Sequence, residues 1–563
     1  MAMFLTAIVA ILGLAGVYLI QEFAIYLGFN LDTSFTNATA AILVTISLLA
    51  ALILRNRIFN KKSLGLTGRQ ALAATIGASL AVRIYFAVTA SIYPDEFGTL
   101  LILAKKPLQD VANFLVDYGL YADGYVCHPP LGYLLMSFGY SFVPSYLGPR
   151  LISIAFSLGA IIVVYSIISE LRYVEPLYPT VLFAFIPHTI VFFSLATTDV
   201  YMNFFGMLGL YFSLKAAKTN SMKSSCFAGL LIALSLWSKA SLGVFWLILS
   251  LVAILLLDRK GRLMKLKKLG AICIVFFLAY IPWYFVNPYA FYWSMYPLLY
   301  IILGFFGRKG YSIWSINPIE AAGTGKSPFI SWMASIFPRL TWAGGSTISY
   351  IELLVQLPLW FTPIVSLLII LGFSSAVRRL KGLNTLLLLW LLVPFLGMLI
   401  RFRDVRYLLI SGIPLVIFAV TGDRFSNRNL RFSIRSLTLA FIAVFLTMTA
   451  PIVQQQYYGV EQAAFEIKNL KLEDSTILTN CRHIEYYLPN TKLIYIEANQ
   501  NSATIKDTIL KQDVKAVLIL HNARGAWPQI DNSTEDFLSD SFDGHVSKGL
   551  SEFSWFELFY IAH

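Results

Sequence analysis

The chain has 563 residues, of which 58% are hydrophobic and 13% charged, and its mean hydropathy is +0.70. Soluble domains carry about 25% charged residues, so this composition excludes a soluble globular protein and indicates a polytopic membrane protein. The formal net charge of +13 does not indicate nucleic-acid binding, because the basic residues cluster in short loops between apolar segments, where they determine topology.

Apolar segments that approach the roughly 20 residues of a membrane helix recur along the chain. The first has neither a basic start nor a small-residue cleavage site, which predicts a retained anchor and not a cleaved signal peptide. Together the segments predict about thirteen transmembrane helices, at residues 3–27, 38–54, 70–92, 149–169, 177–195, 200–216, 225–238, 241–257, 269–287, 355–376, 384–400, 407–421 and 436–454.

Lysine and arginine in short loops predict which side of the membrane each loop occupies. The loop 93–148 is then extracytoplasmic, and its apolar stretch 131–144 lies along the outer surface or dips into it. The long loop 288–354 is also outside, and its aromatic stretch 291–306 is predicted to be an interfacial helix. The basic loops predicted to be cytoplasmic are 55–69, 215–223, 258–268, 378–381 and 423–435.

The composition changes at about residue 455, where acidic residues come to exceed basic ones. Strand-like runs at 476–479, 493–496 and 516–520, with a helix-like stretch at 505–511, predict a small α/β domain outside the cytoplasm. The fold class is therefore an all-α polytopic membrane domain with a C-terminal α/β domain. Its parts are residues 1–69 (two helices and a basic loop), 70–454 (the main membrane domain) and 455–563.

Four cysteines occur, and none forms a Cys-x-x-Cys pair, so no zinc or redox motif is present. Cys127 and Cys481 fall on the same predicted side of the membrane. A disulfide between them is compatible with that placement, but the sequence does not fix the distance between the two residues.

Two adjacent carboxylates, Asp95 and Glu96, follow Tyr93-Pro94 at the outer end of an apolar segment. Pro94 disfavours helix at the residue before it, so the pair begins a new segment at the boundary between lipid and water. One carboxylate could accept a proton from an acceptor hydroxyl while the other orients it or holds a cation. The structural alternative is a pair of acids at a helix N-terminus, stabilised by the helix dipole.

A second acid, Asp199, opens the predicted span 200–216 at the same depth. It is a candidate site residue, although aspartate is also a good N-cap. Lys239 lies at the top of the short hairpin 224–257, near the hydrocarbon edge, where a lysine is costly unless it is paired or snorkels. We expect Lys239 to meet either a lipid phosphate or Asp199.

Arginines at the outer end of another helix, in the run 401–407, oppose the positive-inside trend. Guanidinium groups suit phosphate oxygens, so Arg403 and Arg406 are candidates for an anion site; the alternative is binding of lipid headgroups. Arg83 lies in mid-span and is expected to face a protein cavity. His128, before Pro129-Pro130, is by itself more typical of a structural histidine.

These residues together resemble the GT-C superfamily of polyprenyl-phosphate-dependent glycosyltransferases, in the branch of the protein O-mannosyltransferases and the bacterial aminoarabinose transferase of lipid A. Residues 93–96, Tyr-Pro-Asp-Glu, resemble the Asp-Glu motif of that branch, and residues 128–132 resemble the mannosyltransferases' His-Pro-Pro-Leu-Gly. Asp199 and Lys239 are similar to an acid and a lysine of the family, and residues 406–409, Arg-Tyr-Leu-Leu, to a run near its lipid-phosphate site.

The resemblance covers roughly residues 70–455, and it implies transfer of a single sugar from a polyprenyl-phosphate donor to a hydroxyl of a lipid, glycan or protein, with inversion. It implies that Asp95, Glu96 and Asp199 are catalytic and that Arg83, His128, Lys239, Arg403, Arg406 and Tyr407 bind substrate. No trefoil sugar-binding repeat and no Trp-Trp-Asp-Tyr-Gly motif is present, which leaves the acceptor open.

No ligand set in the sequence demands a metal, although a divalent ion could bridge the acids. A transporter is the main rival interpretation, but transporters usually carry ionisable residues in mid-span and inverted repeats. Here the acids lie at span ends and no repeat is found. A receptor or scaffold that presents the C-terminal domain is the third interpretation. The number of predicted spans argues against it, because an anchor needs far fewer.

Overall fold

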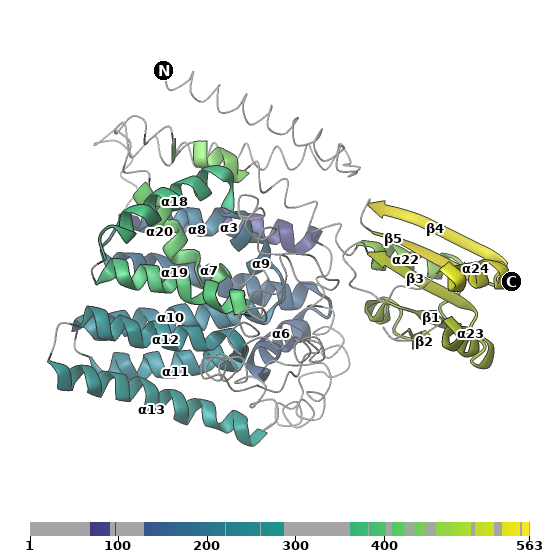
Figure 1. Cartoon of the computed structure of the whole chain (residues 1–563), viewed down its shortest axis with the longest axis horizontal. Helices are drawn as coiled ribbons and strands as arrows, with labels where there is room; N and C mark the ends of the chain where they lie inside the picture. The colour runs from purple at the N-terminus through teal and green to yellow at the C-terminus, as the bar shows by residue number, and fades with distance from the viewer. Residues whose placement is uncertain are drawn as a thin grey trace, which may run out of the picture.

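The computed structural model has two parts, a helical bundle and a smaller domain built on a β-sheet (Figure 1). The predicted spans 3–27 and 38–54 and the predicted interfacial helix 291–306 lie outside the residues that the structure describes. Those residues are 68–90, 96, 129–219, 221–258, 261–286, 361–380, 382–400, 408–422, 431, 434–435, 437–443, 446, 458–496, 502–522, 532–551 and 554–561.

The bundle is built from apolar helices whose bounds follow the apolar segments of the sequence. They are α3 (Gly68–Thr89), α6 (Pro130–Phe142), α7 (Leu147–Leu171), α8 (Leu177–Phe185), α9 (Pro187–Ser194), α10 (Thr198–Thr219), α11 (Met222–Ser238), α12 (Ala240–Leu257), α13 (Arg262–Val286), α18 (Pro363–Val377), α19 (Leu383–Ile400) and α20 (Gly412–Gly422).

Within the described residues, two helices are long and apolar enough to cross a membrane, Gly68–Val88 and Leu147–Leu171. A third span is added if α8 and α9 count as one, although they are bent by 59° with respect to each other. The other apolar helices in the described part do not meet this criterion of length and hydropathy. The thirteen predicted spans therefore stay a prediction.

The break between α8 and α9 corrects the predicted helix 177–195. Proline has no N–H and disrupts the turn before it, and Pro187 begins α9 after the non-helical residue Ile186 (φ −54°, ψ 132°). Thr189 Oγ1 donates a hydrogen bond to the carbonyl of Phe183, and Arg83 Nη1 donates one to the carbonyl of Ala184 at 3.0 Å. These are the carbonyls that a continuous helix would pair with residues 187 and 188.

One large buried cluster joins α3, α7, α8, α9, α10, α12, α18, α19 and α20, and a second joins α6 to α10, α11, α12 and α13. Helices α10, α11, α12 and α13 lie side by side in the bundle (Figure 1). The hairpin predicted over residues 224–257 is confirmed, because α11 and α12 are separated by the single non-helical residue Lys239. The bundle therefore brings the starts of α6, α7, α10 and α12 into one region.

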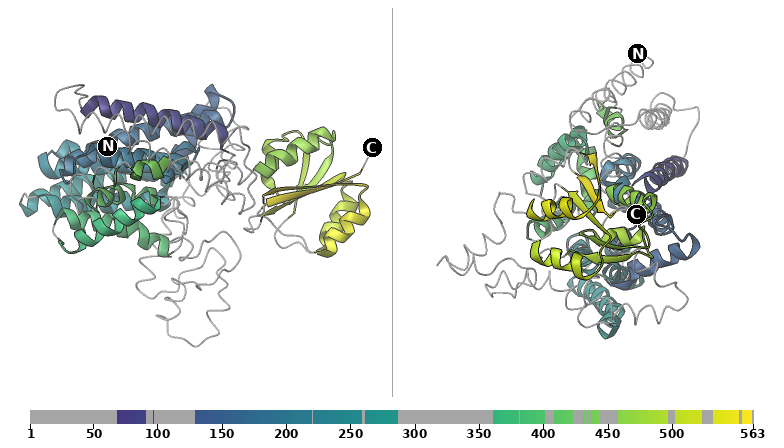
Figure 2. Two further views of the ribbon diagram at one scale, coloured as in Figure 1. Left: turned by 90° about the horizontal axis from the view of Figure 1, so that it is seen from above. Right: turned by 90° about the vertical axis from the view of Figure 1, so that its right-hand side faces the viewer.

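The C-terminal domain contains a mixed five-stranded sheet in the order β2-β1-β3-β5-β4. Strand β1 pairs in parallel with β2 and β3, and β5 pairs antiparallel with β3 and β4. Helices cover both faces (Figure 2). Its elements are α22 (Tyr458–Asn469), β1 (Thr476–Thr479), the 3-10 helix η3 (Arg482–Tyr486), β2 (Lys492–Tyr495), α23 (Ser502–Lys511), β3 (Ala516–Asn522), α24 (Asn532–Ser541), β4 (Gly544–Ser551) and β5 (Ser554–Tyr560).

The predicted strands 476–479, 493–496 and 516–520 and the predicted helix 505–511 are thus confirmed to within a few residues. The pattern did not predict the β4–β5 hairpin. Cys481 is buried in the core of this domain, and Cys127 lies outside the described residues, so the disulfide considered between them stays a prediction.

Candidate active site

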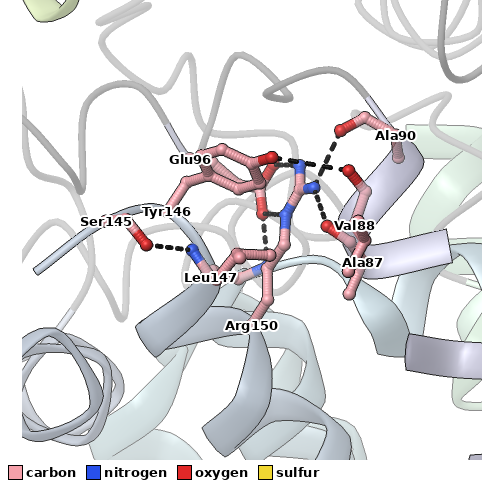
Figure 3. Close-up of polar contacts among 9 residues, drawn as sticks. Ala87, Val88, Ala90, Glu96, Ser145, Tyr146, Leu147 and Arg150 are labelled. Atoms are coloured by element: carbon pink, nitrogen blue, oxygen red, sulfur yellow. Dashed lines mark hydrogen bonds and ion pairs between the residues drawn. The ribbon is translucent and has the colours of Figure 1, made fainter. Parts of the chain in front are cut away.

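Glu96 is completely buried and forms a two-pronged ion pair with Arg150 of α7 (Figure 3). Arg150 Nε donates to Glu96 Oε1 at 2.8 Å, and Arg150 Nη2 donates to Glu96 Oε2 at 2.7 Å. This fork geometry is the strong, directional form of an arginine–carboxylate contact. Neither side chain has any exposed area, so each charge depends on the other for compensation.

The remaining nitrogen of Arg150 ties α7 to the end of α3. Nη1 donates to the carbonyl oxygens of Ala87 at 2.6 Å and Ala90 at 2.8 Å (Figure 3). The last carbonyls of a helix lack intrahelical donors and carry partial negative charge, which a cation satisfies. Arg150 thus fixes Glu96 relative to the C-terminal end of α3.

Glu96 also reaches the segment that leads into α10. Its Oε1 atom accepts a hydrogen bond from the backbone N–H of Ala196 at 2.6 Å. Three residues later, Asp199 lies in the first turn of α10. A single carboxylate therefore joins three parts of the chain that are remote in sequence: the residues after α3, the start of α7 and the start of α10.

Asp199 forms the second buried ion pair. Lys239 Nζ lies 2.9 Å from both carboxylate oxygens, Oδ1 and Oδ2, and the two side chains are 1% and 3% exposed. Of the two partners predicted for Lys239, the structure therefore gives Asp199. Lys239 can reach it because the joint between α11 and α12 is extended there (φ −158°, ψ 96°).

Gly132, the last residue of the His-Pro-Pro-Leu-Gly motif, lies against the residues that directly precede Asp199 and Lys239. A Cβ atom at position 132 would lie 2.8 Å from Thr198 Cγ2 and 3.4 Å from the carbonyl oxygen of Ser238. Only glycine leaves room for α6 to approach both the start of α10 and the joint before α12. Gly132 therefore lies close to the residues before Asp199 and Lys239, although these positions are remote in sequence.

Arg83 is fully buried, as expected for a mid-span arginine, and its described partners belong to the protein. Its Nη1 atom donates to the hydroxyl of Ser79 and to the carbonyl of Ala184 at the α8–α9 break. Arg83 thus caps the C-terminal end of α8. The chain continues from this break through α9 to Ala196 and Asp199. Its predicted role in substrate binding stays a prediction.

The other predicted site residues lie outside the described residues. These are Asp95, His128, Arg403, Arg406 and Tyr407. Among the described residues no group of three or more His, Cys, Asp and Glu side chains is placed to hold a metal ion. The described acids of the site instead have cationic side chains as partners.

The sequence did not single out Arg150, which lies near the start of the predicted span 149–169. The available signal was a charged residue just inside an apolar segment on the side assigned to the exterior, where the positive-inside trend predicts few cations. Tyr146, one helical turn before it, was also missed. The Arg150 guanidinium lies over the Tyr146 ring, 4.9 Å from its centroid.

Comparison with known proteins finds similarity to one family model and to the folds of solved membrane glycosyltransferases. Residues 127–285 match the family model described as dolichyl-phosphate-mannose-protein mannosyltransferase. None of the curated protein sequences matches the chain.

The fold is similar to that of ArnT from Cupriavidus metallidurans bound to undecaprenyl phosphate, with a TM-score of 0.52 and 14% identity over 86% of this chain and 97% of that one. It is also similar to the oligosaccharyltransferase of Archaeoglobus fulgidus, with a TM-score of 0.52 and 12% identity over 82% of this chain and 70% of that one. The resemblance predicted from the motifs is thereby confirmed at the level of the fold and of one segment: the fold is similar to those of ArnT and the archaeal oligosaccharyltransferase, and residues 127–285 match the mannosyltransferase family model.

Proposed function

We propose that the protein is an integral membrane enzyme that moves a single sugar from a polyprenyl-phosphate donor to a hydroxyl acceptor at the extracytoplasmic face, with inversion at the anomeric carbon. The observation that carries the proposal is the fixed position of Glu96, which Arg150 and the Ala196 amide hold between α3, α7 and α10. A buried carboxylate with three hydrogen bonds is a fixed point of the chain, and Asp95 precedes it directly in sequence.

The proposal divides the two adjacent carboxylates by role. The oxygens of Glu96 already accept hydrogen bonds from a guanidinium and an amide, so we propose that Glu96 positions the site. Asp95 is therefore the proposed general base that accepts the proton of the acceptor hydroxyl as the oxygen attacks the anomeric carbon. The bond between the sugar and the phosphate breaks in the same displacement, and the lipid phosphate leaves with the electron pair.

The leaving phosphate needs positive charge. Arg403 and Arg406 are the proposed partners for it, together with Tyr407 and His128 as further contacts. The donor class agrees with the dolichyl-phosphate mannose named in the family description and with the undecaprenyl phosphate bound to ArnT. The proposed acceptor is a hydroxyl of a lipid, a glycan or a protein, and a panel of acceptors of these three classes distinguishes them.

The test uses the purified full chain in nanodiscs with radiolabelled polyprenyl-phosphate sugars and envelope extract as acceptor. Asp95→Asn should lower transfer by about 10²–10⁴-fold, the usual contribution of a general base, while polyprenyl-phosphate binding is retained. Asp117→Asn, which removes another acid from the same loop, should transfer sugar like the unmodified protein. Transfer by Asp95→Asn at the control rate would overturn the assignment of the base.

A further inference from the structure

The C-terminal domain contacts the membrane bundle close to the Glu96–Arg150 pair. Tyr140 of α6 and Tyr146, just before α7, pack against the hydrophobic core of the C-terminal domain. Tyr486 and Tyr487, at the end of η3, pack against the same core, and their rings meet edge to face with centroids 5.2 Å apart. Two tyrosines from each part thus share one apolar cluster.

Tyr146 is also in direct contact with the buried arginine. Its ring lies under the Arg150 guanidinium at 4.9 Å, and its hydroxyl donates to the carbonyl of Val88 at the end of α3 at 3.4 Å (Figure 3). Guanidinium groups are weakly hydrated and stack well on aromatic faces. Tyr146 therefore supports Arg150 on one face of the guanidinium and carries the contact from the C-terminal domain to the ion pair.

Electrostatics agree with this geometry. Burial raises the pKa of the Tyr487 hydroxyl, and the nearby Glu461 carboxylate raises it further, whereas Arg150 acts in the opposite direction. Burial likewise raises the pKa of the Tyr486 hydroxyl. The field of Arg150 thus reaches both tyrosines, as expected if the aromatic cluster closes over the ion pair from the outside.

We propose that Tyr486 and Tyr487 are positioning residues for the transfer site: through Tyr146 they hold the Arg150 guanidinium, which fixes Glu96. The inference rests on the proposed function and deepens it, because it makes the C-terminal domain a part of the catalytic unit. An alternative role for such a domain is to capture the acceptor. The two roles predict different kinetics, since misplacement of the site lowers kcat and loss of an acceptor surface raises the acceptor KM.

The first measurement does not depend on sugar transfer. The Ala196 amide donates to Glu96 Oε1, so hydrogen exchange in a peptide that contains Ala196 reports the position of Glu96. Tyr487→Ala should speed this exchange about tenfold or more, and Tyr487→Phe, which keeps the ring, should not. The matched control is Tyr495→Ala, because Tyr495 is also half-buried in the C-terminal domain and its hydroxyl donates to Glu485 of the same domain at 3.1 Å.

The second measurement is transfer by the same variants. Tyr487→Ala should lower kcat about ten- to a hundredfold, as expected for a misplaced site, with an unchanged acceptor KM; Tyr487→Phe should restore kcat and Tyr495→Ala should retain it. If the unmodified chain transfers no sugar but Ala196 exchange still responds to position 487, the proposed function fails and the structural coupling holds.

Three results would overturn the positioning role. They are unchanged Ala196 exchange in Tyr487→Ala, a raised acceptor KM with unchanged kcat, or a Tyr495→Ala variant that behaves like Tyr487→Ala. Exchange across β3 shows whether the C-terminal domain stays folded. If exchange across β3 rises in Tyr487→Ala, Tyr487→Lys is used instead, because lysine keeps an apolar stem and places a second cation beside Arg150. Unchanged Ala196 exchange in Tyr487→Lys would also overturn the proposal.

Discussion

The Glu96–Arg150 pair makes a quantitative prediction about stability, because both side chains are fully buried. Glu96→Gln leaves the guanidinium without a counter-charge, and Arg150→Met leaves the carboxylate without one. Breaking a buried pair by removing one partner costs about 3–5 kcal/mol. We expect each single substitution to lower the free energy of unfolding by about that amount.

The double variant, Glu96→Gln with Arg150→Met, should cost clearly less than the sum of the two single substitutions. It leaves no uncompensated charge in the interior, so a coupling energy of about 2–3 kcal/mol is expected. The assay is reversible denaturation of the full chain in mixed micelles. The control is Lys218→Met, since Lys218 pairs with Glu170 while both side chains are about one-third exposed, and such pairs contribute at most about 1 kcal/mol. Additive costs, or single costs no larger than the control, would refute the reasoning.

Lys239→Met should impair transfer strongly, and Asp199→Asn in the same chain should partly restore it if Lys239 serves to neutralise Asp199; no rescue in the transfer assay would indicate that the ammonium contacts the donor itself. Gly132→Ala should destabilise the chain by about 1–3 kcal/mol through overpacking, and Thr198→Ser, which removes the clashing Cγ2 atom, should recover most of this loss in the same denaturation assay. Burial raises the pKa of the Tyr487 hydroxyl, so the neutral phenol stabilises the folded state fully below about pH 10, the ordinary tyrosine pKa. This stabilisation is lost as the pH rises above that value. Tyr487→Phe should therefore reduce the fall in melting temperature at alkaline pH, measured in a series of melting curves.

The helical elements were largely predictable because apolar runs and their interruptions are local signals. Lys239 interrupts an apolar stretch, and α11 and α12 end and begin on either side of it. The break at Pro187 was predictable in principle, since proline removes a helix donor, but apolar content alone favoured one helix over 177–195. Strand β4, Gly-His-Val-Ser-Lys-Gly-Leu-Ser, lacks an alternating apolar pattern and becomes a strand through its pairing with β5.

The site was predictable only as a set of candidates. Asp199 and Lys239 were found because acids and lysines at span ends are uncommon and costly, and a short hairpin suggested that they could meet. Arg150 was missed because its partner Glu96 is 54 positions away, and a pairing over that distance depends on how α3 and α7 pack. The same holds for Gly132, whose role follows from the approach of Thr198 and Ser238 and not from its neighbours in sequence.

The two buried pairs also bear on where the donor phosphate can bind. Arg150 and Glu96 cancel each other's charge, and Lys239 contacts both oxygens of Asp199, so these described residues contribute four charges but no net charge. A phosphate that develops negative charge as it leaves needs net positive potential. That potential has to come from cations beyond the two pairs, and Arg403 and Arg406 are the candidates that the sequence offers. We therefore propose two separate roles: the pairs hold the ends of the helices in place, and Arg403 and Arg406 supply the charge.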